Sequence, residues 1–464
     1  MNNDKRVVMP TLDKDERVNN FLEVETGLTD EQAIKEASRC LQCNNPRCVK
    51  GCPVGIMIPK FIKEILNNDL DKAYEIILES SSLPAICGRV CPQEKQCESM
   101  CIRGLKGDSI AIGYLERYVA DNNKYVDRSD IKKNGKSVAI VGSGPSGLSC
   151  AYELLKTGFD VTIYEVLHEL GGVLTYGIPE FRLPKNVVSK EIDKLKKMGC
   201  NFITDVLVGN TFTIDELKEK YDYVFIGTGA GVPKFMDIPG EDANSVFSAN
   251  EILTRINLMK AYNSSKTPIK KGNVCYVIGG GNVAMDAARS LRRLGINVHL
   301  MYRRSMDELP ARKMEVSHAM EEGIVFDLLK LPKEILVDDD NNVIGMKVVD
   351  MKLGDIDESG RRSVYEDLDS IHDIKCDMVV MALGTSINKE VLKNSSIKTN
   401  DKGLIEVNGS KTSYDNVYAG GDAITGSATV ILAMEAGKKA ALEIKESLDW
   451  FFFFFVKVLV FFEF

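Results

Sequence analysis

SVAIVGSGPSG, residues 137–147, decides the fold of the largest part of this chain. The mainly apolar run 137–141 predicts a buried β-strand, and the glycines after it predict a tight turn into a helix. In such a turn Gly142 permits the bend, Gly144 lets the backbone approach a pyrophosphate, and Gly147 allows close packing of helix on strand. Pro145 lies in the same motif. A doubly wound α/β domain is therefore predicted to begin here.

The strand that should follow, DVTIY at 160–164, ends next to Glu165. A carboxylate in this position can accept hydrogen bonds from ribose hydroxyls. Strand, glycines, helix, strand and acid together indicate a dinucleotide site. The alternative is an ordinary β-α-β turn that uses glycine only for tightness.

A second glycine motif, GGGNVA at 279–284, follows the expected strand 273–278 and opens an expected helix over 285–291. Its members Gly279, Gly281, Asn282 and Ala284 are candidate coenzyme-binding residues.

The position that holds Glu165 in the first motif is occupied by Tyr302 in the second, and Arg303 and Arg304 come next. Forked guanidinium groups can hold a 2′-phosphate, which a carboxylate would repel. This pattern predicts NADP rather than NAD. The alternative is that both arginines form a solvated surface pair.

A β run with glycines returns at VYAGGD, 417–422, which includes Gly421 and Asp422. The simplest arrangement inserts one nucleotide domain inside another. We therefore expect two nested Rossmann-like domains of the glutathione-reductase type: a discontinuous domain of residues 135–250 and 381–447, and an inserted domain of residues 251–380.

The N-terminal part, residues 1–134, is expected to contain only helices and loops. Thr29 begins a capping box with Gln32, which predicts a helix leading into a cluster of cysteines. Two further amphipathic helices should open near Pro59 and Asp71.

Eight of the twelve cysteines lie in two short runs in this N-terminal part: Cys40, Cys43, Cys48 and Cys52, then Cys87, Cys91, Cys97 and Cys101. Zinc sites usually use paired C-x2-C knuckles, and only Cys40 and Cys43 have that spacing. Runs of four cysteines ending near proline indicate iron-sulfur binding, although the middle spacing is wider than in the bacterial ferredoxin run. A zinc-binding scaffold without catalysis is the alternative. The isolated Cys150, Cys200, Cys275 and Cys376 are expected in the core.

The whole chain has 464 residues, 44% hydrophobic and 27% charged, with net charge -8 and a pI near 5.4. About three domains of ordinary size are expected. An acidic chain has no basic footprint for nucleic acid. The first twenty residues contain no apolar stretch, so a cytoplasmic location is expected, where thiols stay reduced and free for metals.

The end of the chain is anomalous, because residues 448–464 are rich in phenylalanine. This run is too short for a membrane span and is interrupted by Lys457. We interpret it as an accidental extension, with membrane tethering as the alternative.

Together the cysteine runs, the segment 111–117, the first glycine motif, the segment GGVLTYGIP at 171–179 and the stretch 418–422 resemble the small subunit of NADPH-dependent glutamate synthase. The same module occurs in the large subunit of NADH-dependent ferredoxin:NADP oxidoreductase and in the N-terminal half of dihydropyrimidine dehydrogenase. The resemblance covers residues 5–447.

The resemblance implies FAD on the first motif, NADPH on the inserted domain and two 4Fe-4S clusters. It further implies that Gly142, Gly144, Gly147 and Glu165 bind FAD and that Asp422 meets its ribityl-pyrophosphate part. Gly172, Leu174 and Arg182 would line the adjacent loop. A helix beginning near Thr429 would direct its positive end toward the flavin ring.

In members of this family, each of the two clusters takes cysteine ligands from both runs. The implied ligands are Cys40, Cys43, Cys48 and Cys101 for one cluster, and Cys52, Cys91, Cys97 and Glu116 for the other. Sequence order alone would assign one cluster to each run and use Cys87 in place of Glu116.

The implied function is an NADPH-oxidising subunit that supplies electrons for glutamate synthesis from glutamine and 2-oxoglutarate. Its partner would be the glutamate synthase large subunit or another flavoprotein, in an oligomer, with neither nucleic acid nor membrane. The alternative is the large subunit of an electron-bifurcating ferredoxin:NADP oxidoreductase.

Overall fold

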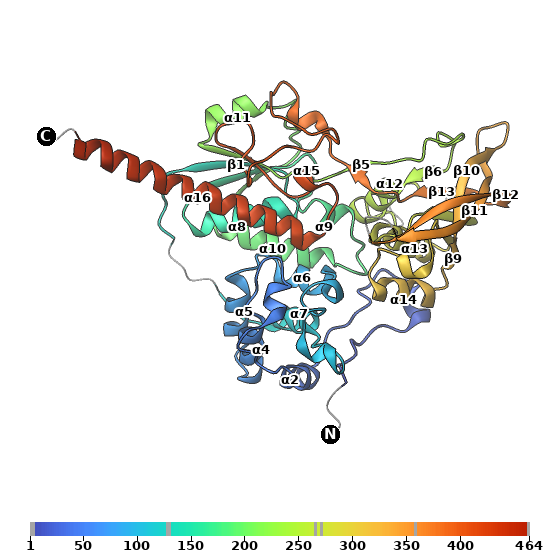
Figure 1. Cartoon of the computed structure of the whole chain (residues 1–464), viewed down its shortest axis with the longest axis horizontal. Helices are drawn as coiled ribbons and strands as arrows, with labels where there is room; N and C mark the ends of the chain where they lie inside the picture. The colour runs from blue at the N-terminus through green and yellow to red at the C-terminus, as the bar shows by residue number, and fades with distance from the viewer. Residues whose placement is uncertain (1–4, 127–130, 264–266, 270–271, 357–359, 462–464) are drawn as a thin grey trace.

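The computed structural model of the protein describes residues 5–126, 131–263, 267–269, 272–356 and 360–461, with side chains as far as Leu448. A helical N-terminal part lies below one sheet domain, and a second sheet domain lies to the side of both (Figure 1). The fold class predicted from the sequence is confirmed: two parallel sheets of the nucleotide-binding type follow a helical part.

The N-terminal part packs its helices around a core that continues into the first sheet domain. Thr29 caps α2 with a complete capping box that includes Gln32, as predicted. The helices expected near Pro59 and Asp71 are α4 and α5. The elements are α1 (Lys14–Arg17), α2 (Asp30–Ser38), α3 (Arg47–Lys50), α4 (Ile58–Leu66), α5 (Leu70–Leu78), α6 (Pro84–Val90), η1 (Gln93–Lys95), η2 (Ile102–Leu105) and α7 (Ile112–Asn122).

The first sheet domain has a parallel sheet whose order in the described chain is β15-β4-β1-β2-β3. Helices α8, α10 and α16 cover the face toward the N-terminal part, and α11 lies on the other side (Figure 1). Its elements are β1 (Ser137–Val141), α8 (Pro145–Lys156), β2 (Asp160–Tyr164), α9 (Val173–Tyr176), α10 (Lys185–Lys197), β3 (Asn201–Ile203), α11 (Ile214–Lys220), β4 (Tyr223–Ile226), η5 (Lys389–Leu392), β15 (Val417–Ala419), α15 (Asp422–Thr425) and α16 (Val430–Phe461).

The second sheet has the order β6-β13-β7-β8-β9 in the described residues and is also parallel. It extends from Val246 to Met381, slightly beyond the expected 251–380, because β6 pairs with β13. Its elements are β6 (Val246–Ser248), α12 (Ala249–Leu253), η3 (Thr254–Leu258), β7 (Val274–Ile278), α13 (Asn282–Arg293), β8 (Asn297–Tyr302), η4 (Met306–Glu308), α14 (Lys313–Glu321), β9 (Val325–Leu328) and β13 (Met378–Met381).

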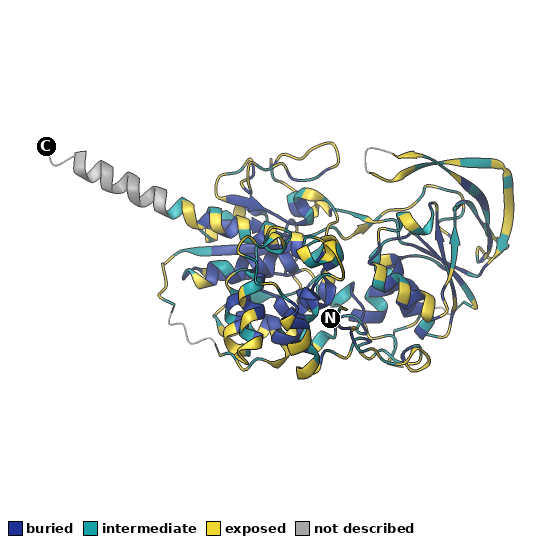
Figure 2. Ribbon diagram, turned by 60° about the horizontal axis from the view of Figure 1, so that its bottom comes forward, coloured by how far each residue is buried: buried dark blue, intermediate teal, exposed yellow. Residues whose placement is uncertain are grey.

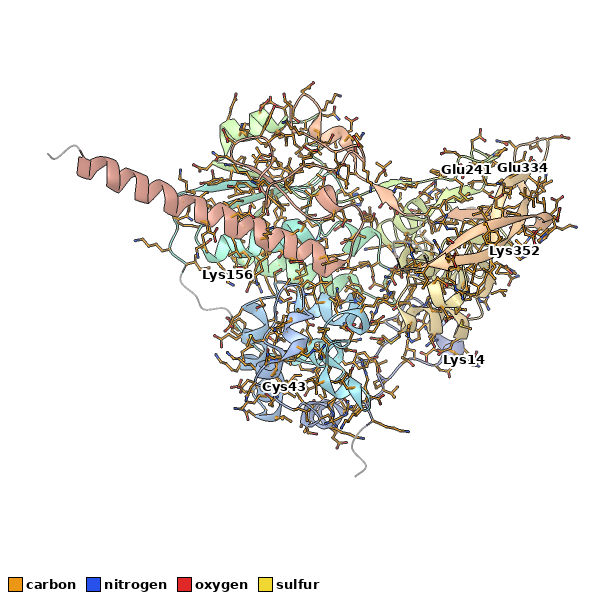
Figure 3. The ribbon with its side chains drawn as sticks, in the orientation of Figure 1. Lys14, Cys43, Lys156, Glu241, Glu334 and Lys352 are labelled. Atoms are coloured by element: carbon orange, nitrogen blue, oxygen red, sulfur yellow. The ribbon has the colours of Figure 1, made fainter. Side chains whose placement is uncertain are left out.

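An antiparallel sheet of β10 (Lys330–Val337), β11 (Val343–Ile356) and β12 (Arg362–Lys375) packs on the second sheet and was not predicted. Its outer part projects away from the body and is largely exposed (Figure 2). The labelled Glu334 and Lys352 mark this sheet, at the opposite end of the molecule from Cys43 in the helical part (Figure 3). The two chain crossings between the sheet domains pair as β5 (Val232–Pro233) and β14 (Thr385–Ser386).

The side chains of the Phe-rich tail after Leu448 are not among those described. The interpretation of the tail as an accidental extension therefore concerns residues outside the described side chains. None of the helices that the structure describes is both long and apolar enough to cross a membrane.

Candidate functional site: a dinucleotide cleft beside two groups of thiols

The first glycine motif forms the turn between β1 and α8 at the carboxyl edge of the first sheet. Gly142 has φ +102°, which favours glycine, and Gly144 caps α8. A Cβ on Gly147 would overlap the carbonyl oxygen of Gly142, so only glycine allows this helix so close to the strand. By contrast, a Cβ on Gly144 would meet no atom within 4 Å. The helix N-terminus therefore faces open space where a pyrophosphate fits.

Glu165 organises the same loop from the end of β2. Its Oε2 accepts hydrogen bonds from the Ser143 amide at 2.9 Å and the Ser143 hydroxyl at 2.6 Å, and its Oε1 accepts from the Leu167 amide at 3.0 Å. The carboxylate retains lone pairs for a ribose. Ser143, which sequence reasoning did not single out, also accepts a hydrogen bond from the Gly171 amide at 2.9 Å.

Two buried hydroxyls beside this loop have no hydrogen-bond partner among the described residues: Ser146 Oγ at the start of α8 and Thr228 Oγ1 after β4. Buried polar atoms are rarely left unpaired, so both indicate a polar ligand. A Cβ on Gly421 would lie 2.9 Å from the Ser146 Cβ, which places the segment of Gly421 and Asp422 against the same cleft. Sequence reasoning missed Ser146 and Thr228, although the stretch GTG at 227–229 after a strand was a possible signal.

Asp422 is half-buried, and its Oδ1 accepts a hydrogen bond from the Ala428 amide at 3.1 Å. Burial raises the pKa of this carboxyl to about 6, an effect that the amide partly offsets. Thr429 directly precedes α16, and its hydroxyl accepts from the Leu432 amide at 3.4 Å. The start of α16 thus lies near Asp422.

The loop after Gly171 lies over the first motif. A Cβ on Gly172, whose φ is +53°, would lie 3.0 Å from the Gly144 Cα. Leu174 is fully buried in the core. Arg182 points elsewhere: its guanidinium binds Asp286 at 2.7 Å and Glu315 at 3.1 Å in the inserted domain.

The second glycine motif forms the corresponding turn between β7 and α13. Gly279 has φ +139°, and a Cβ there would overlap the Ala382 carbonyl oxygen. Gly281 caps α13 and faces open space, as Gly144 does in the first motif. Asn282 accepts a hydrogen bond from the Arg312 amide at 3.0 Å, and Ala284 is fully buried. The turn has the form of a second pyrophosphate site.

The two arginines after β8 have different surroundings. Arg303 is exposed, whereas Arg304 is buried and its Nε donates to the Arg362 carbonyl of β12 at 2.6 Å. Arg303 is thus the freer of the two to reach a 2′-phosphate, because Arg304 is tied to the antiparallel sheet.

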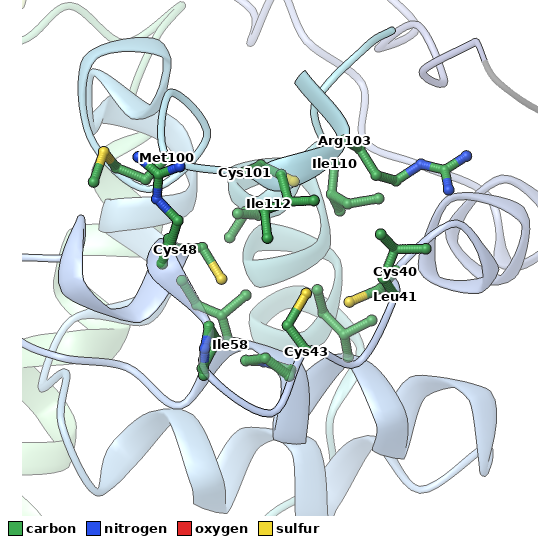
Figure 4. Close-up of a pocket in the computed structure, with 15 residues that line it drawn as sticks. Cys40, Leu41, Cys43, Cys48, Ile58, Met100, Cys101, Arg103, Ile110 and Ile112 are labelled. Carbon is green, nitrogen blue, oxygen red and sulfur yellow. The ribbon is translucent and has the colours of Figure 1, made fainter. Parts of the chain in front are cut away.

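The first group of thiols lines a cavity in the helical part that is partly open to solvent. In Figure 4, the sulfurs of Cys40, Cys43, Cys48 and Cys101 point toward its centre from two separate segments. Burial, and then the neighbouring thiols, raise the pKa of Cys48 to about 11. Arg47 and Arg103 also line the cavity.

The second group joins Cys52, Cys91, Cys97 and Glu116, whose charges act on one another. Burial raises the pKa of both the Cys52 and the Cys97 thiol. The Glu116 carboxylate raises the pKa of Cys52 further, and Glu98, Cys52 and then Glu116 raise that of Cys97 further. Glu116, on α7, has a pKa of about 8 because it is fully buried. Its Oε1 has no hydrogen-bond partner among the described residues.

Cys87 lies next to this second group. A hydrogen bond with Cys87 is the main cause that raises the pKa of Cys91. The Cys87 sulfur also contacts the Met434 sulfur of α16 at 3.4 Å. Both Cys87 and Glu116 therefore lie next to the second group of thiols. Of the two, only Glu116 has a described side-chain atom, Oε1, without a hydrogen-bond partner.

Soft thiolates around a cavity suit an iron-sulfur cluster, which has several atoms to accommodate. Among the described residues, no three His, Cys, Asp or Glu side chains form a ready site for a single metal ion. The four thiols around the first cavity fit a 4Fe-4S cluster, and the second group offers three thiols and a carboxylate as donors.

Comparison with known proteins agrees with this arrangement. Residues 17–127 match the family described as dihydropyrimidine dehydrogenase domain II, 4Fe-4S cluster, and residues 136–437 match the pyridine nucleotide-disulphide oxidoreductase family. The chain is 35% identical to the glutamate synthase [NADPH] small chain of Escherichia coli K12, over 91% of this chain and 92% of that one. It is 36% identical to the NADP(+)-dependent formate dehydrogenase subunit beta of Moorella thermoacetica, over 86% of this chain and 60% of that one.

Among solved structures, Mycobacterium tuberculosis FprA in complex with NADPH superposes with a TM-score of 0.59 and 21% identity, over 68% of this chain and 84% of that one. This likeness concerns the fold of the two sheet domains.

The fold and the site define an NADPH-dependent oxidoreductase that joins a 4Fe-4S domain to a flavin- and NADP-binding pyridine nucleotide oxidoreductase module. Within that class, the chain belongs to the family of glutamate synthase small chains.

Proposed function

We propose that this chain takes electrons from NADPH and passes them, through FAD and two 4Fe-4S clusters, to a glutamate synthase large subunit that makes glutamate from glutamine and 2-oxoglutarate. The observation that carries the proposal is the presence of two separate thiol groups in one core with the strand and helix of the first glycine motif. With the cofactors bound, the nicotinamide supplies hydride, FAD separates its two electrons, and the clusters carry them singly.

The chain's own residues divide into a binding site for each cofactor. The first glycine motif, Glu165 and Asp422 would hold FAD, and the second motif with Arg303 would hold NADPH. We assign Cys101, from the second cysteine run, to the cluster of the first run, because it lines one cavity with Cys40, Cys43 and Cys48. The other cluster would then be held by the second group of thiols together with Glu116.

The order of transfer follows from burial. Cys91 and Cys97 are buried, and Cys87 beside them contacts α16, which starts at the FAD cleft. All four thiols of the first cavity are partly exposed. If both groups hold clusters, the second would be the one nearer FAD and the first the one nearer a partner protein at the surface.

The test is anaerobic reconstitution of the full chain with a glutamate synthase large subunit. We expect NADPH oxidation that depends on both glutamine and 2-oxoglutarate and yields glutamate. NADPH oxidation by the chain with artificial acceptors but no glutamate with the large subunit would overturn the proposed acceptor.

A second candidate is a subunit that exchanges electrons with a different flavoprotein or dehydrogenase, as in ferredoxin-linked reductases. The similarity to a formate dehydrogenase subunit favours it, since that relative carries the same module in a longer chain. Co-purification from native cells separates the two candidates by the identity of the partner. We further propose a cytoplasmic oligomer for either case.

A further inference from the structure

Helix α16 connects the proposed FAD cleft with the second group of thiols. It starts next to Thr429 and packs along α8, the helix that follows the first glycine motif. A Cβ on Gly437 would overlap the Ser146 carbonyl oxygen, so the two helices are in direct backbone contact. The position of α16 relative to the cleft is thereby fixed.

The next residue, Lys438, extends from α16 into the helical part. Its Nζ donates hydrogen bonds to the Ser80 carbonyl at 3.0 Å and the Val54 carbonyl at 3.4 Å. Val54 belongs to the loop directly after Cys52. The amides of Val54, Gly55 and Ile56 point toward the Cys52 sulfur. Lys438 therefore holds the segment that presents Cys52.

Two carboxyl groups lie beside the second group of thiols, and burial raises the pKa of both; one of them, Glu98, is also ion-paired with Arg6. Glu116 acts on Cys52, Cys91 and Cys97, and Glu98 acts on Cys97. Lys438 is a cation whose charge acts on Cys52, with Glu153 and Lys156 as its other charged neighbours. Arg47 and Arg103 are among the residues that line the first cavity, and in Figure 4 the Arg103 guanidinium points away from its centre.

We propose that Lys438 is a positioning residue which fixes the Cys52 loop against α16 and whose positive charge raises the reduction potential of the cluster held by Cys52, Cys91, Cys97 and Glu116. Reduction adds negative charge to a cluster, and a fixed cation nearby stabilises the reduced form. The FAD-binding domain would thus set the potential of the centre that takes its electrons. This inference rests on the proposed function, because it requires a cluster at this site.

The experiment compares Lys438→Gln, Lys438→Arg and Lys439→Gln in the full chain purified without oxygen. Lys438→Gln removes the charge and keeps an N–H donor for the loop, and Lys438→Arg keeps the charge. Lys439→Gln makes the same charge change on the neighbouring exposed residue. The potentials of both clusters are measured by redox titration followed by electron paramagnetic resonance, and Glu116→Gln identifies the signal of the second cluster.

Lys438→Gln should lower the potential of the second cluster and leave the first unchanged, whereas Lys438→Arg and Lys439→Gln should match the wild type. Equal potentials in Lys438→Gln and wild type, or an equal shift of both clusters, would overturn the inference. Loss of the second signal in Lys438→Gln with recovery in Lys438→Arg would support the fixing of the loop and overturn the effect on potential. A wild-type protein without two cluster signals would instead overturn the proposed function.

Discussion

Arg182 connects the loop beside the first glycine motif to the inserted domain through two buried ion pairs. Its side chain is 7% exposed, and those of Asp286 and Glu315 are 5% and 6% exposed. Burial alone would raise the pKa of Glu315, but Arg182 and then Arg289 outweigh it and hold the pKa at about 2. The two carboxylates on α13 and α14 thus depend on Arg182 for their charge balance.

Replacing Arg182 by Met leaves both carboxylates buried without this partner. Breaking a buried ion pair in this way costs about 3–5 kcal/mol. With a urea dependence of about 3 kcal/mol per M, the unfolding midpoint of the affected domains should fall by about 1–2 M at pH 7.

The loss should depend on pH in a defined direction. The pKa of Glu315 in the folded protein, about 2, is below the usual glutamate value of 4.5, so its stabilising effect is complete above pH 4.5 and disappears as the pH falls toward 2. The difference between wild type and Arg182→Met should therefore be largest at neutral pH and shrink below pH 4.5.

The assay is urea unfolding at several pH values, followed by circular dichroism. The control is Arg255→Met, which breaks a surface pair with Glu251 whose side chains are 33% and 41% exposed and which should cost less than about 1 kcal/mol. A loss in Arg182→Met no larger than in the control, or a loss that does not change with pH, would refute the reasoning.

Three further predictions concern cofactor binding. Glu116→Ala should change the spectrum of one cluster while Cys87→Ala leaves both intact; the opposite result, measured with iron and sulfide content, would assign one cluster to each run. Arg303→Ala should reduce the preference for NADPH over NADH in kcat/KM by about 10- to 150-fold, since a hydrogen bond to a charged group contributes about 1.5–3 kcal/mol; an unchanged ratio would remove Arg303 from the coenzyme site. Gly147→Ala should purify with less than about a tenth of the wild-type FAD, because its Cβ would overlap the Gly142 carbonyl oxygen; normal flavin content measured by absorbance would contradict the assigned turn.

Local signals in the sequence were sufficient for the first strand and the glycine turn of each nucleotide domain, and for the strand at 160–164. The strands expected at 137–141 and 160–164 have those bounds in the structure, because short apolar runs flanked by glycine turns have few other solutions. The capping box at Thr29 was equally local. The antiparallel sheet β10-β11-β12 was not predicted, because its exposed strands lack a regular alternation of apolar and polar residues.

The site could be predicted only as far as its parts are local in sequence. Glycine turns follow from spacing, but the convergence of Cys101 with the first cysteine run depends on η2 and α4 lining the same cavity, and spacing alone does not determine it. The same holds for Arg182, which the resemblance placed beside FAD and which the structure pairs with Asp286. Ser146 and Thr228 became visible only through their burial without partners.

The central claim is that one chain carries electrons from NADPH through a flavin to iron-sulfur clusters. The most direct measurement is the visible spectrum of the purified chain when NADPH is added without oxygen. We expect a yellow-brown protein whose flavin and cluster absorbance both bleach, in the absence of any partner. A colourless protein, or a coloured one whose absorbance does not change with NADPH, would contradict it.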